Sequence, residues 1–339
     1  MRAAVFRAPG APLEIASAPD PVAGAGEVIV RVKNCGVCGS DLHAAGSQKL
    51  KLPAGTIMGH EFAGVIDEVG AGVTGFSAGD AVAGMSMVAC GGCAMCRSGA
   101  AVRCLAAKPL GFGEVAGAFA ELVKTRPGSL YKVPATISFR AAATVEPLVV
   151  GLHGLRRARF QAGDSALIMG GGTIGLVTLL WARFAGAGAI VVSEVLLPRR
   201  DLALKLGADG AVDPRMRNPA AEMVRLSGAP PDVVFECIGA PGTLAQAIDY
   251  AARGGRVAVL GASMEDDGFA PGAAMSRELE IYFSLGLEVG EVETTIAALA
   301  AGRIASEAMI THTVALEELP RAFAAMAESG LPGKLMLEF

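Results

Sequence analysis

The chain has 339 residues, which at roughly 150 residues per domain predicts about two domains, each large enough to bury its own core. Its 29 Lys and Arg against 33 Asp and Glu give a net charge of -4, so we expect no basic face for phosphates and no nucleic-acid partner. Hydrophobic residues make up 52% and charged residues 18% of the chain, which excludes intrinsic disorder and makes membrane-spanning segments worth testing.

The most apolar stretch, residues 166–193, lacks the ~20 unbroken apolar residues of a membrane helix. Three glycines at 170–172 and Arg183 interrupt it, which predicts a strand, a turn, a helix and a second strand. Near the N-terminus, Arg7, Pro9 and Glu14 interrupt any apolar run of the ~7 to 15 residues that a secretory signal contains. We therefore expect a cytoplasmic protein without a membrane partner, whose seven cysteines are metal ligands or free thiols rather than disulfides.

The pattern of apolar residues changes along the chain. Up to about residue 130, short apolar runs separated by Gly, Pro and Asp predict mostly β structure, as at 27–33, 63–69 and 80–87. From about residue 137, helical runs alternate with fully apolar strands, a pattern typical of buried parallel strands joined by crossover helices. These strands are expected at 166–169, 190–193, 232–235 and 256–260. A strand over 279–285, a helix over 292–301 and a closing strand over 334–339 follow, and we expect this tail to return to the first domain.

One group of potential metal ligands is spread along the chain and consists of Cys38, His60, Glu61 and Glu146. A catalytic zinc needs about three protein ligands and one open position, which mixed Cys, His and carboxylate ligation supplies. Spacing alone does not establish such a site. A packed thiol is the alternative for Cys38, and a structural, hydrogen-bonded role is the alternative for each histidine. The histidines of the chain are His43, His60, His153 and His312.

A second group of potential ligands is compact. Cys90, Cys93, Cys96 and Cys104 form a CxxCxxCx7C pattern in a segment rich in Gly and Ala. Four thiolates this close together suit a closed tetrahedral zinc site, which stabilises a lobe with little apolar surface of its own. An iron–sulfur cluster and four free thiols are the alternatives.

A glycine-rich turn follows the expected strand that ends at residue 169. Gly170, Gly172 and Gly175 form GxGxxG, with Thr173 and Ile174 opening the helical run that continues to residue 184. In this context the first glycine permits a tight turn, the second lets the backbone approach a pyrophosphate, and the third lets helix and strand pack closely. A glycine-rich turn without a ligand is the alternative.

The next apolar strand ends at Glu194, 19 residues after Gly175, where a carboxylate can accept hydrogen bonds from both ribose hydroxyls. Its charge would repel a 2′-phosphate, which favours NAD over NADP. Arg199 and Arg200 leave NADP open, because an arginine here could pair with that phosphate.

Taken in order, these motifs resemble the zinc-dependent medium-chain alcohol dehydrogenases, and within them the sorbitol and threonine dehydrogenase branch. The residues that carry the resemblance are GVCGSDLH at 36–43, GHE at 59–61, the four-cysteine segment, EPLVVGLH at 146–153, GGGTIG at 170–175, DVVFECIG at 232–239 and GGRVAVLG at 254–261. The resemblance implies an α/β fold with a GroES-like β-barrel catalytic domain over 1–150 and 286–339, which holds the zinc sites. It implies a Rossmann domain, a doubly wound parallel sheet, over 151–285.

The resemblance also implies roles for single residues. Cys38, His60 and Glu61 correspond to the ligands of a catalytic zinc, and Glu146 to a ligand that reaches it directly or through water. Asp41 would orient His60 from behind, and Ser40 and His43 correspond to a proton relay. Two zinc ions per chain are implied, with the four cysteines holding the structural one. Gly170, Gly172, Thr173, Ile174, Gly175, Glu194 and Arg199 correspond to the cofactor site.

The resemblance gives less information about the substrate. Ala44 and Gly286 stand where sorbitol dehydrogenases carry side chains for polyol hydroxyls, and Met58, Met85, Met87, Phe112, Phe119 and Leu285 are candidates for an apolar pocket. We therefore expect a secondary alcohol or diol as the small-molecule substrate. L-Threonine 3-dehydrogenase, a polyol dehydrogenase and a non-catalytic nicotinamide-binding protein are the alternatives. A homodimer or homotetramer is expected, with the apolar run 279–287 either at an interface or buried inside the sheet.

Overall fold

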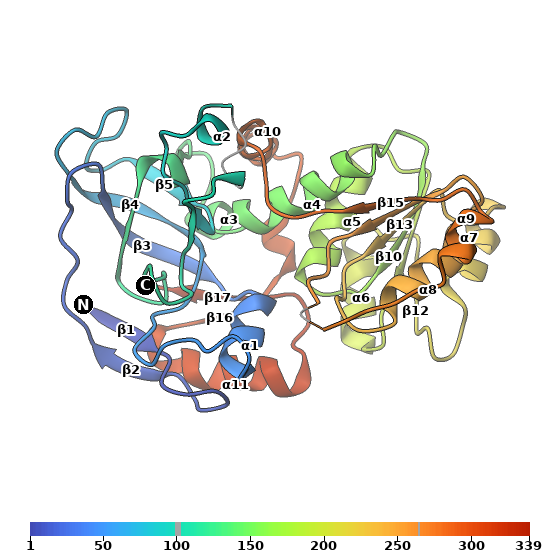
Figure 1. The fold of residues 1–339 in the computed structure, drawn as a ribbon, viewed down its shortest axis with the longest axis horizontal. Coiled ribbons are helices and arrows are strands. Elements are labelled where there is room, and N and C mark those ends of the chain that lie inside the picture. Colours follow the sequence, from blue (N-terminus) through green and yellow to red (C-terminus); the bar gives the residue numbers. More distant parts are fainter. Residues whose placement is uncertain (99–102, 264) are drawn as a thin grey trace. The chain divides into compact units, whose positions relative to one another are not determined.

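The computed structural model describes residues 1–98, 103–263 and 265–339, which form two compact units (Figure 1). The first unit comprises residues 1–146, 287–302 and 310–339, and the second comprises residues 147–286 and 303–309. The boundaries expected from the sequence put residues 303–309 in the first domain, whereas in the structure they group with the second unit. None of the helices in the described ranges combines the length and hydrophobicity that a membrane crossing requires.

The first unit is built on a seven-stranded sheet with the order β16-β17-β3-β4-β5-β9, in which β8 also pairs with β3. Its longest strands, β3 (Val28–Gly36) and β4 (Glu61–Val69), run antiparallel, with Gly36 opposite Glu61. β17 (Lys334–Glu338) pairs antiparallel with β3, so the C-terminal segment lies in the same sheet as the N-terminal half.

Further short strands complete this unit, and its helices are short as well. The strands are β1 (Arg2–Val5), β2 (Glu14–Ser17), β5 (Ala81–Gly84), β6 (Met87–Val88), β7 (Lys108–Pro109), β8 (Leu122–Thr125), β9 (Leu130–Lys132) and β16 (Ile310–Val314). The helices are α1 (Gly39–Gly46), α2 (Ala94–Arg97), α3 (Phe139–Ala142), α10 (Val289–Ala300) and α11 (Leu319–Ser329), with 3-10 turns η2 (Pro127–Ser129) and η4 (Leu316–Glu318).

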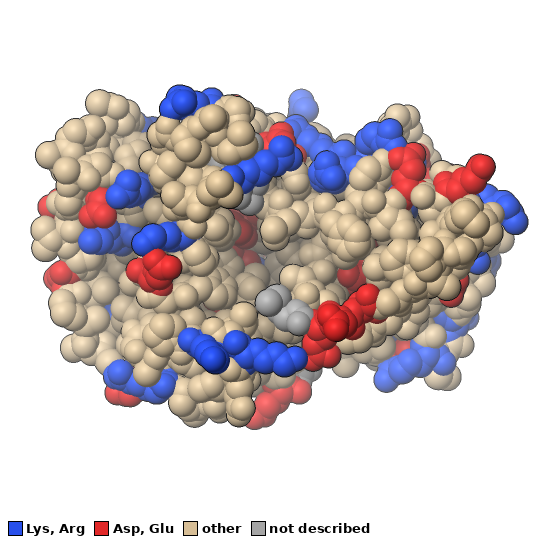
Figure 2. Space-filling model, in the orientation of Figure 1, with Lys and Arg blue, Asp and Glu red and all other residues tan. Residues whose placement is uncertain are grey.

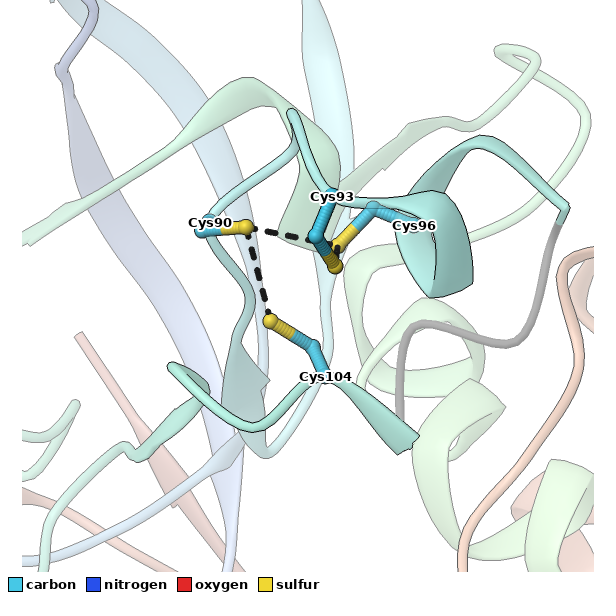
Figure 3. A group of neighbouring side chains, drawn as sticks. All are labelled: Cys90, Cys93, Cys96 and Cys104. Carbon is cyan, nitrogen blue, oxygen red and sulfur yellow. Dashed lines mark hydrogen bonds between the residues drawn. The ribbon is translucent and has the colours of Figure 1, made fainter.

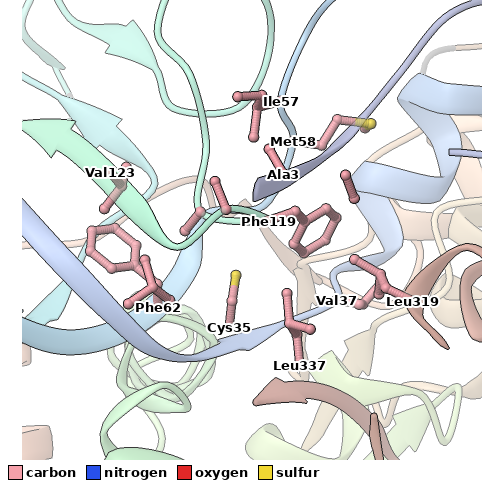
Figure 4. Close-up of a cluster of buried hydrophobic side chains, with 14 of the residues drawn as sticks. Ala3, Cys35, Val37, Ile57, Met58, Phe62, Phe119, Val123, Leu319 and Leu337 are labelled. Carbon is pink, nitrogen blue, oxygen red and sulfur yellow. The ribbon is translucent and has the colours of Figure 1, made fainter. Parts of the chain in front are cut away.

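The core of the first unit gathers side chains from distant parts of the sequence (Figure 4). Met58 and Phe119, which the sequence offers as pocket candidates, are both fully buried in this core. Gly59 has a φ of 90°, and a Cβ there would overlap the ring of Phe119. The ring of Phe119 therefore fills the space where a side chain on residue 59 would lie. Gly59 is the residue that precedes His60 in the sequence.

The second unit is a six-stranded, all-parallel sheet with the order β12-β11-β10-β13-β14-β15. From β10 the chain proceeds outward through β11 and β12, and then returns to β13 and proceeds outward on the other side. The topological switch point therefore lies between β10 and β13, where open α/β sheets bind their ligands. The expected α/β class with a doubly wound parallel sheet is confirmed.

Helices α5 and α8 pack on β10 and β13, and α6 and α7 pack towards β11 and β12. The strands are β10 (Ser165–Met169), β11 (Ala189–Ser193), β12 (Gly210–Val212), β13 (Val233–Glu236), β14 (Arg256–Val259) and β15 (Glu280–Phe283). The helices are α4 (Val145–Arg157), which begins in the last residues of the first unit, α5 (Thr173–Phe184), α6 (Leu197–Lys205), α7 (Pro219–Ser227), α8 (Thr243–Tyr250) and α9 (Pro271–Met275), with the 3-10 turn η3 (Ser306–Met309).

β15 is the last strand of its sheet within the described residues, so the apolar run 279–287 does not form a buried internal strand of this chain. Phe283 is 63% and Leu285 83% exposed, which also takes Leu285 out of any apolar pocket within its own unit.

Figure 2 shows charged side chains of both signs on one face of the molecule, with Lys and Arg gathered in several small groups.

We expect Phe119→Ala to destabilise the first unit by about 3–5 kcal/mol, because the cavity beside Gly59 cannot close without moving backbone. Urea unfolding followed by circular dichroism measures the change. The exposed Phe283→Ala is the control and should change the free energy of unfolding by less than about 1 kcal/mol. Equal effects of the two changes would contradict the packing described here.

Candidate metal centre and dinucleotide site

Sheet register brings together the first group of candidate ligands. Gly36, the last residue of β3, is paired with Glu61, the first residue of β4. Cys38 follows β3 by two residues and His60 directly precedes β4, so both side chains lie at the same edge of the sheet as Glu61. The ligand atoms of Cys38, His60 and Glu61 all lie within 4.8 Å of one another.

Asp41 lies behind His60 and is fully buried. Its Oδ2 accepts a hydrogen bond from the Cys38 backbone N–H at 3.0 Å, while Oδ1 lies 3.3 Å from His60 Nδ1. These last two atoms are buried and have no other partner in the described residues. Burial opposes a charge on His60, but the Asp41 carboxylate outweighs it and holds the pKa of His60 well above its usual value. Because Asp41 Oδ1 faces Nδ1, the proton of the neutral imidazole lies on Nδ1, and Nε2 is the nitrogen left for another ligand.

The carboxylate of Glu61 is held by a lysine to which no sequence motif points. Lys334 Nζ donates to Glu61 Oε1 at 2.7 Å, to Glu61 Oε2, and to the Val37 carbonyl at 3.0 Å, so all three of its protons are used. Both side chains are essentially inaccessible to water. Burial lowers the pKa of Lys334, but the charge of Glu61 reverses this and raises the pKa above its usual value. A single lysine at the start of the apolar run LMLEF was the available signal.

Glu146 lies at the start of α4 and is 7% exposed. Burial raises its pKa, the charge of Glu61 adds to this effect, and His60 opposes it. Glu146 therefore lies close enough to interact with both residues, but it is not in the group whose ligand atoms lie within 4.8 Å of one another.

Ser40 and His43 lie on one face of α1, three residues apart. The Ser40 hydroxyl is 3.5 Å from His60 Nε2, and the His43 side chain is exposed to solvent. Phe112 closes another side of the imidazole, with its ring centroid 5.5 Å from that of His60.

The residues present fit a zinc ion. Sulfur, imidazole nitrogen and carboxylate oxygen are the donors that zinc takes, and the buried Nδ1 of His60 facing Asp41 is the arrangement typical of a metal-ligating histidine.

The four-cysteine group is a second site that fits zinc (Figure 3). Its sulfur–sulfur distances are 3.4 Å for Cys93–Cys96, 3.5 Å for Cys90–Cys104 and 3.8 Å for Cys90–Cys96. A tetrahedron with Zn–S bonds of about 2.3 Å has edges of about 3.8 Å. Backbone N–H groups of Gly92 and Cys93 donate to the Cys90 sulfur and lower its pKa to about 6, which favours a thiolate. Burial and the neighbouring Cys93 raise the pKa of Cys96 to about 12 when no metal compensates the charge.

The glycine-rich turn lies between β10 and α5 in the second unit. Gly170 has a φ of 93°, and a Cβ on Gly175 would overlap the Gly170 carbonyl, so helix and turn touch as the pattern predicts. Gly172 is the N-cap of α5, and the space where its Cβ would lie is open. Thr173 and Ile174 form the first turn of the helix, whose free backbone N–H groups suit an anion.

Glu194 directly follows β11 and is 6% exposed. Its Oε2 accepts from Gly171 N at 2.8 Å, and its Oε1 accepts from Leu196 N at 2.9 Å, which ties the glycine-rich turn to the next strand. Arg199, considered in the sequence as a partner for a 2′-phosphate, has a nitrogen 3.7 Å from Glu194 Oε2. The charge of Arg199 therefore faces the carboxylate of Glu194.

We expect Lys334→Met to destabilise the metal-free protein by about 3–5 kcal/mol, because it leaves the buried Glu61 charge uncompensated. The double change Lys334→Met with Glu61→Gln should recover most of this loss. Lys132→Met is the matched control, since this 53% exposed lysine pairs with Asp80 at the surface and contributes about 0–1 kcal/mol. Urea unfolding after chelation measures all three, and an additive double mutant would contradict the buried pair.

Comparison with known proteins matches both units to family models. The alcohol dehydrogenase GroES-like domain matches residues 24–135, and the zinc-binding dehydrogenase model matches residues 173–301. The L-threonine 3-dehydrogenase of Francisella philomiragia subsp. philomiragia is 32% identical over 96% of this chain and 95% of its own length. The sorbitol dehydrogenase of Bacillus subtilis is 33% identical over 75% of this chain and 73% of its own length.

Among solved structures, the 2R,3R-butanediol dehydrogenase of Bacillus subtilis has a TM-score of 0.90 and 28% identity, covering 100% of this chain and 99% of that one. On this likeness in sequence and fold, the chain belongs to the zinc-dependent medium-chain dehydrogenase family.

Proposed function

We propose that the protein is a zinc-dependent alcohol dehydrogenase that transfers hydride reversibly between a secondary alcohol or diol and NAD. The observation that carries the proposal is the group of Cys38, His60 and Glu61 with Asp41 behind the imidazole. Two zinc ions per chain are proposed, one at this group with Glu146 nearby and one at the four cysteines. Such an ion supplies a Lewis acid that lowers the pKa of the substrate alcohol.

The chain's own residues then handle the proton. Ser40 Oγ lies 3.5 Å from His60 Nε2, so its hydroxyl lies beside the ligand group and can take the proton of an alcohol bound there while it gives up its own. His43, one turn along α1, can pass that proton to solvent because its side chain is exposed. Asp41 keeps the imidazole in the orientation that this arrangement needs.

The cofactor half of the proposal rests on the second unit. The N-terminus of α5 and the open space at Gly172 suit a pyrophosphate, and Glu194 suits the hydroxyls of the adenosine ribose. NAD is preferred to NADP because the buried Glu194 charge repels a 2′-phosphate, and Arg199 faces Glu194.

A secondary alcohol is favoured by the relatives' names, since positions 3 of threonine and 2,3 of butanediol both carry secondary hydroxyls. Phe112 beside His60 adds an apolar wall at the reacting end. L-Threonine and polyols remain the competing substrates, and a non-catalytic nicotinamide-binding protein is the competing class.

We propose a cytoplasmic location and a homodimer or homotetramer. All seven cysteines are free thiols in the structure, as expected in a reducing compartment, and β15 offers an unpaired edge among the described strands.

The test is a panel of secondary alcohols, diols, polyols and L-threonine assayed with NAD and NADP, together with zinc analysis of Cys38→Ser and Cys104→Ser. Each variant should lose about one of two zinc ions. Cys38→Ser should abolish turnover with little change in melting temperature, while Cys104→Ser should lower the melting temperature because structural zinc contributes folding energy. Cys237→Ser, a thiol outside both groups, should keep both ions. Full turnover by Cys38→Ser would refute the proposal.

We expect Glu194→Ser to raise KM for NAD by about 10- to 100-fold, since hydrogen bonds to a charged group contribute about 1.5–3 kcal/mol. KM for NADP should fall, because removing the carboxylate leaves Arg199 to meet the 2′-phosphate. Glu222→Gln, a buried carboxylate on α7 paired with Arg225 at 2.7 Å, is the control and should leave both constants unchanged. An unchanged ratio of the two constants in Glu194→Ser would contradict the assignment.

A further inference from the structure

Glu236 is a buried carboxylate that none of the proposed steps uses. It is the last residue of β13, only 2% exposed, and it lies opposite Met169 of β10 on one side and Val259 of β14 on the other. Its position is therefore directly beside the switch point of the sheet, across from the glycine-rich turn.

The Glu236 side chain folds the segment that follows it. Its Oε1 accepts hydrogen bonds from Ile238 N at 2.7 Å and from Gly239 N at 2.9 Å. The main-chain oxygen of the same residue accepts from Leu260 N at 2.8 Å and Gly261 N at 2.9 Å. One residue thus fixes the turn after β13 and ties it to the turn after β14.

These turns touch one another through positions without side chains. A Cβ on Gly261 would lie 2.6 Å from Glu236 Oε2, and a Cβ on Gly170 would lie 2.9 Å from Ile238 Cγ1. The turn at 237–239 therefore packs between the glycine-rich turn and the turn after β14. A shift of this turn would displace both of its neighbours.

The same hydrogen bond, from a backbone N–H to the glutamate side chain two residues earlier, occurs on the other side of the switch point. Glu194 accepts from Leu196 N, two residues ahead, just as Glu236 accepts from Ile238 N, two residues ahead. Glu194 lies on the side of β11 and β12, where the adenosine ribose is proposed to bind. A dinucleotide whose pyrophosphate lies at α5 must extend its other half over β13 and β14.

We propose that Glu236 is a positioning residue for the nicotinamide half of the cofactor, acting through the main-chain turn at 237–239. This inference rests on the proposed function. The carboxylate keeps two amides of the turn occupied, so the turn presents one fixed backbone surface to the cofactor rather than a set of interconverting ones.

The test measures the affinity of the metal-loaded protein for NADH and for AMP by isothermal titration calorimetry. Glu236→Ala should raise the Kd for NADH about 10- to 100-fold, the scale expected when a bound group is misplaced by about 1 Å. The Kd for AMP, which occupies only the adenosine side, should change less than about twofold. Glu236→Gln keeps an oxygen acceptor for both amides and should bind NADH within about threefold of wild type.

Glu222→Ala is the matched control, a buried carboxylate of the same unit that is 5% exposed and pairs with Arg217 and Arg225. It should leave the ratio of the two Kd values unchanged even if it lowers the melting temperature. If Glu236→Ala does not fold, Glu236→Asp, whose shorter side chain cannot reach both amides, takes its place with the same expected split.

Two results would overturn the inference: parallel losses of NADH and AMP affinity, which indicate a general structural role, or an unchanged Kd for NADH. A wild-type protein that binds AMP but not NADH would refute the proposed function itself, and this inference with it.

Discussion

The metal-ligand group of the first unit depends on the balance of charge in a space that water does not reach. Asp41 and Glu61 are both fully buried carboxylates, and the Cys38 thiol lies close to Glu61 and His60. Isolated charges in such surroundings are costly, so each must have a partner. Lys334 neutralises Glu61, and the imidazole faces Asp41. The proposed divalent cation, bound between sulfur, nitrogen and oxygen, would add the positive charge that a thiolate there requires.

The geometry of this group follows from the register of one sheet. Pairing of Gly36 with Glu61 places the ends of β3 and β4 side by side, and pairing of β17 with β3 places Lys334 beneath them. The Val37 carbonyl, which continues β3, accepts the third proton of Lys334. A slip of one residue in either pairing would turn these side chains to the opposite face. Backbone hydrogen bonding therefore determines the donor set before any metal binds.

The sequence predicts some parts of the molecule well and others poorly, for physical reasons. The four cysteines and the glycine-rich turn are local patterns, and their geometry follows from spacing. Cys38 follows β3, whereas His60 and Glu61 stand at the start of β4, so their spacing in the sequence does not establish a site and only the family resemblance joins them. Lys334 was missed because its role depends on a pairing between β17 and β3, far apart in the chain. The sequence offers Arg199 as a partner for a 2′-phosphate, because it does not show that this arginine faces Glu194. Met58 and Phe119 were pocket candidates, but Gly59 gives Phe119 its place in the core.

The order of these residues along the chain bears on how the protein is made. All the proposed ligands of both metal ions lie within the first 146 residues, whereas the lysine that neutralises Glu61 lies beyond the whole parallel sheet. During synthesis, the cysteines and the carboxylate of Glu61 therefore leave the ribosome well before Lys334, the counterion of Glu61. During that interval every proposed ligand of both groups is already present, but the Glu61 carboxylate has no lysine to neutralise it. The charge balance of the dispersed group is therefore completed only when β17 joins β3, after the whole second unit has been synthesised.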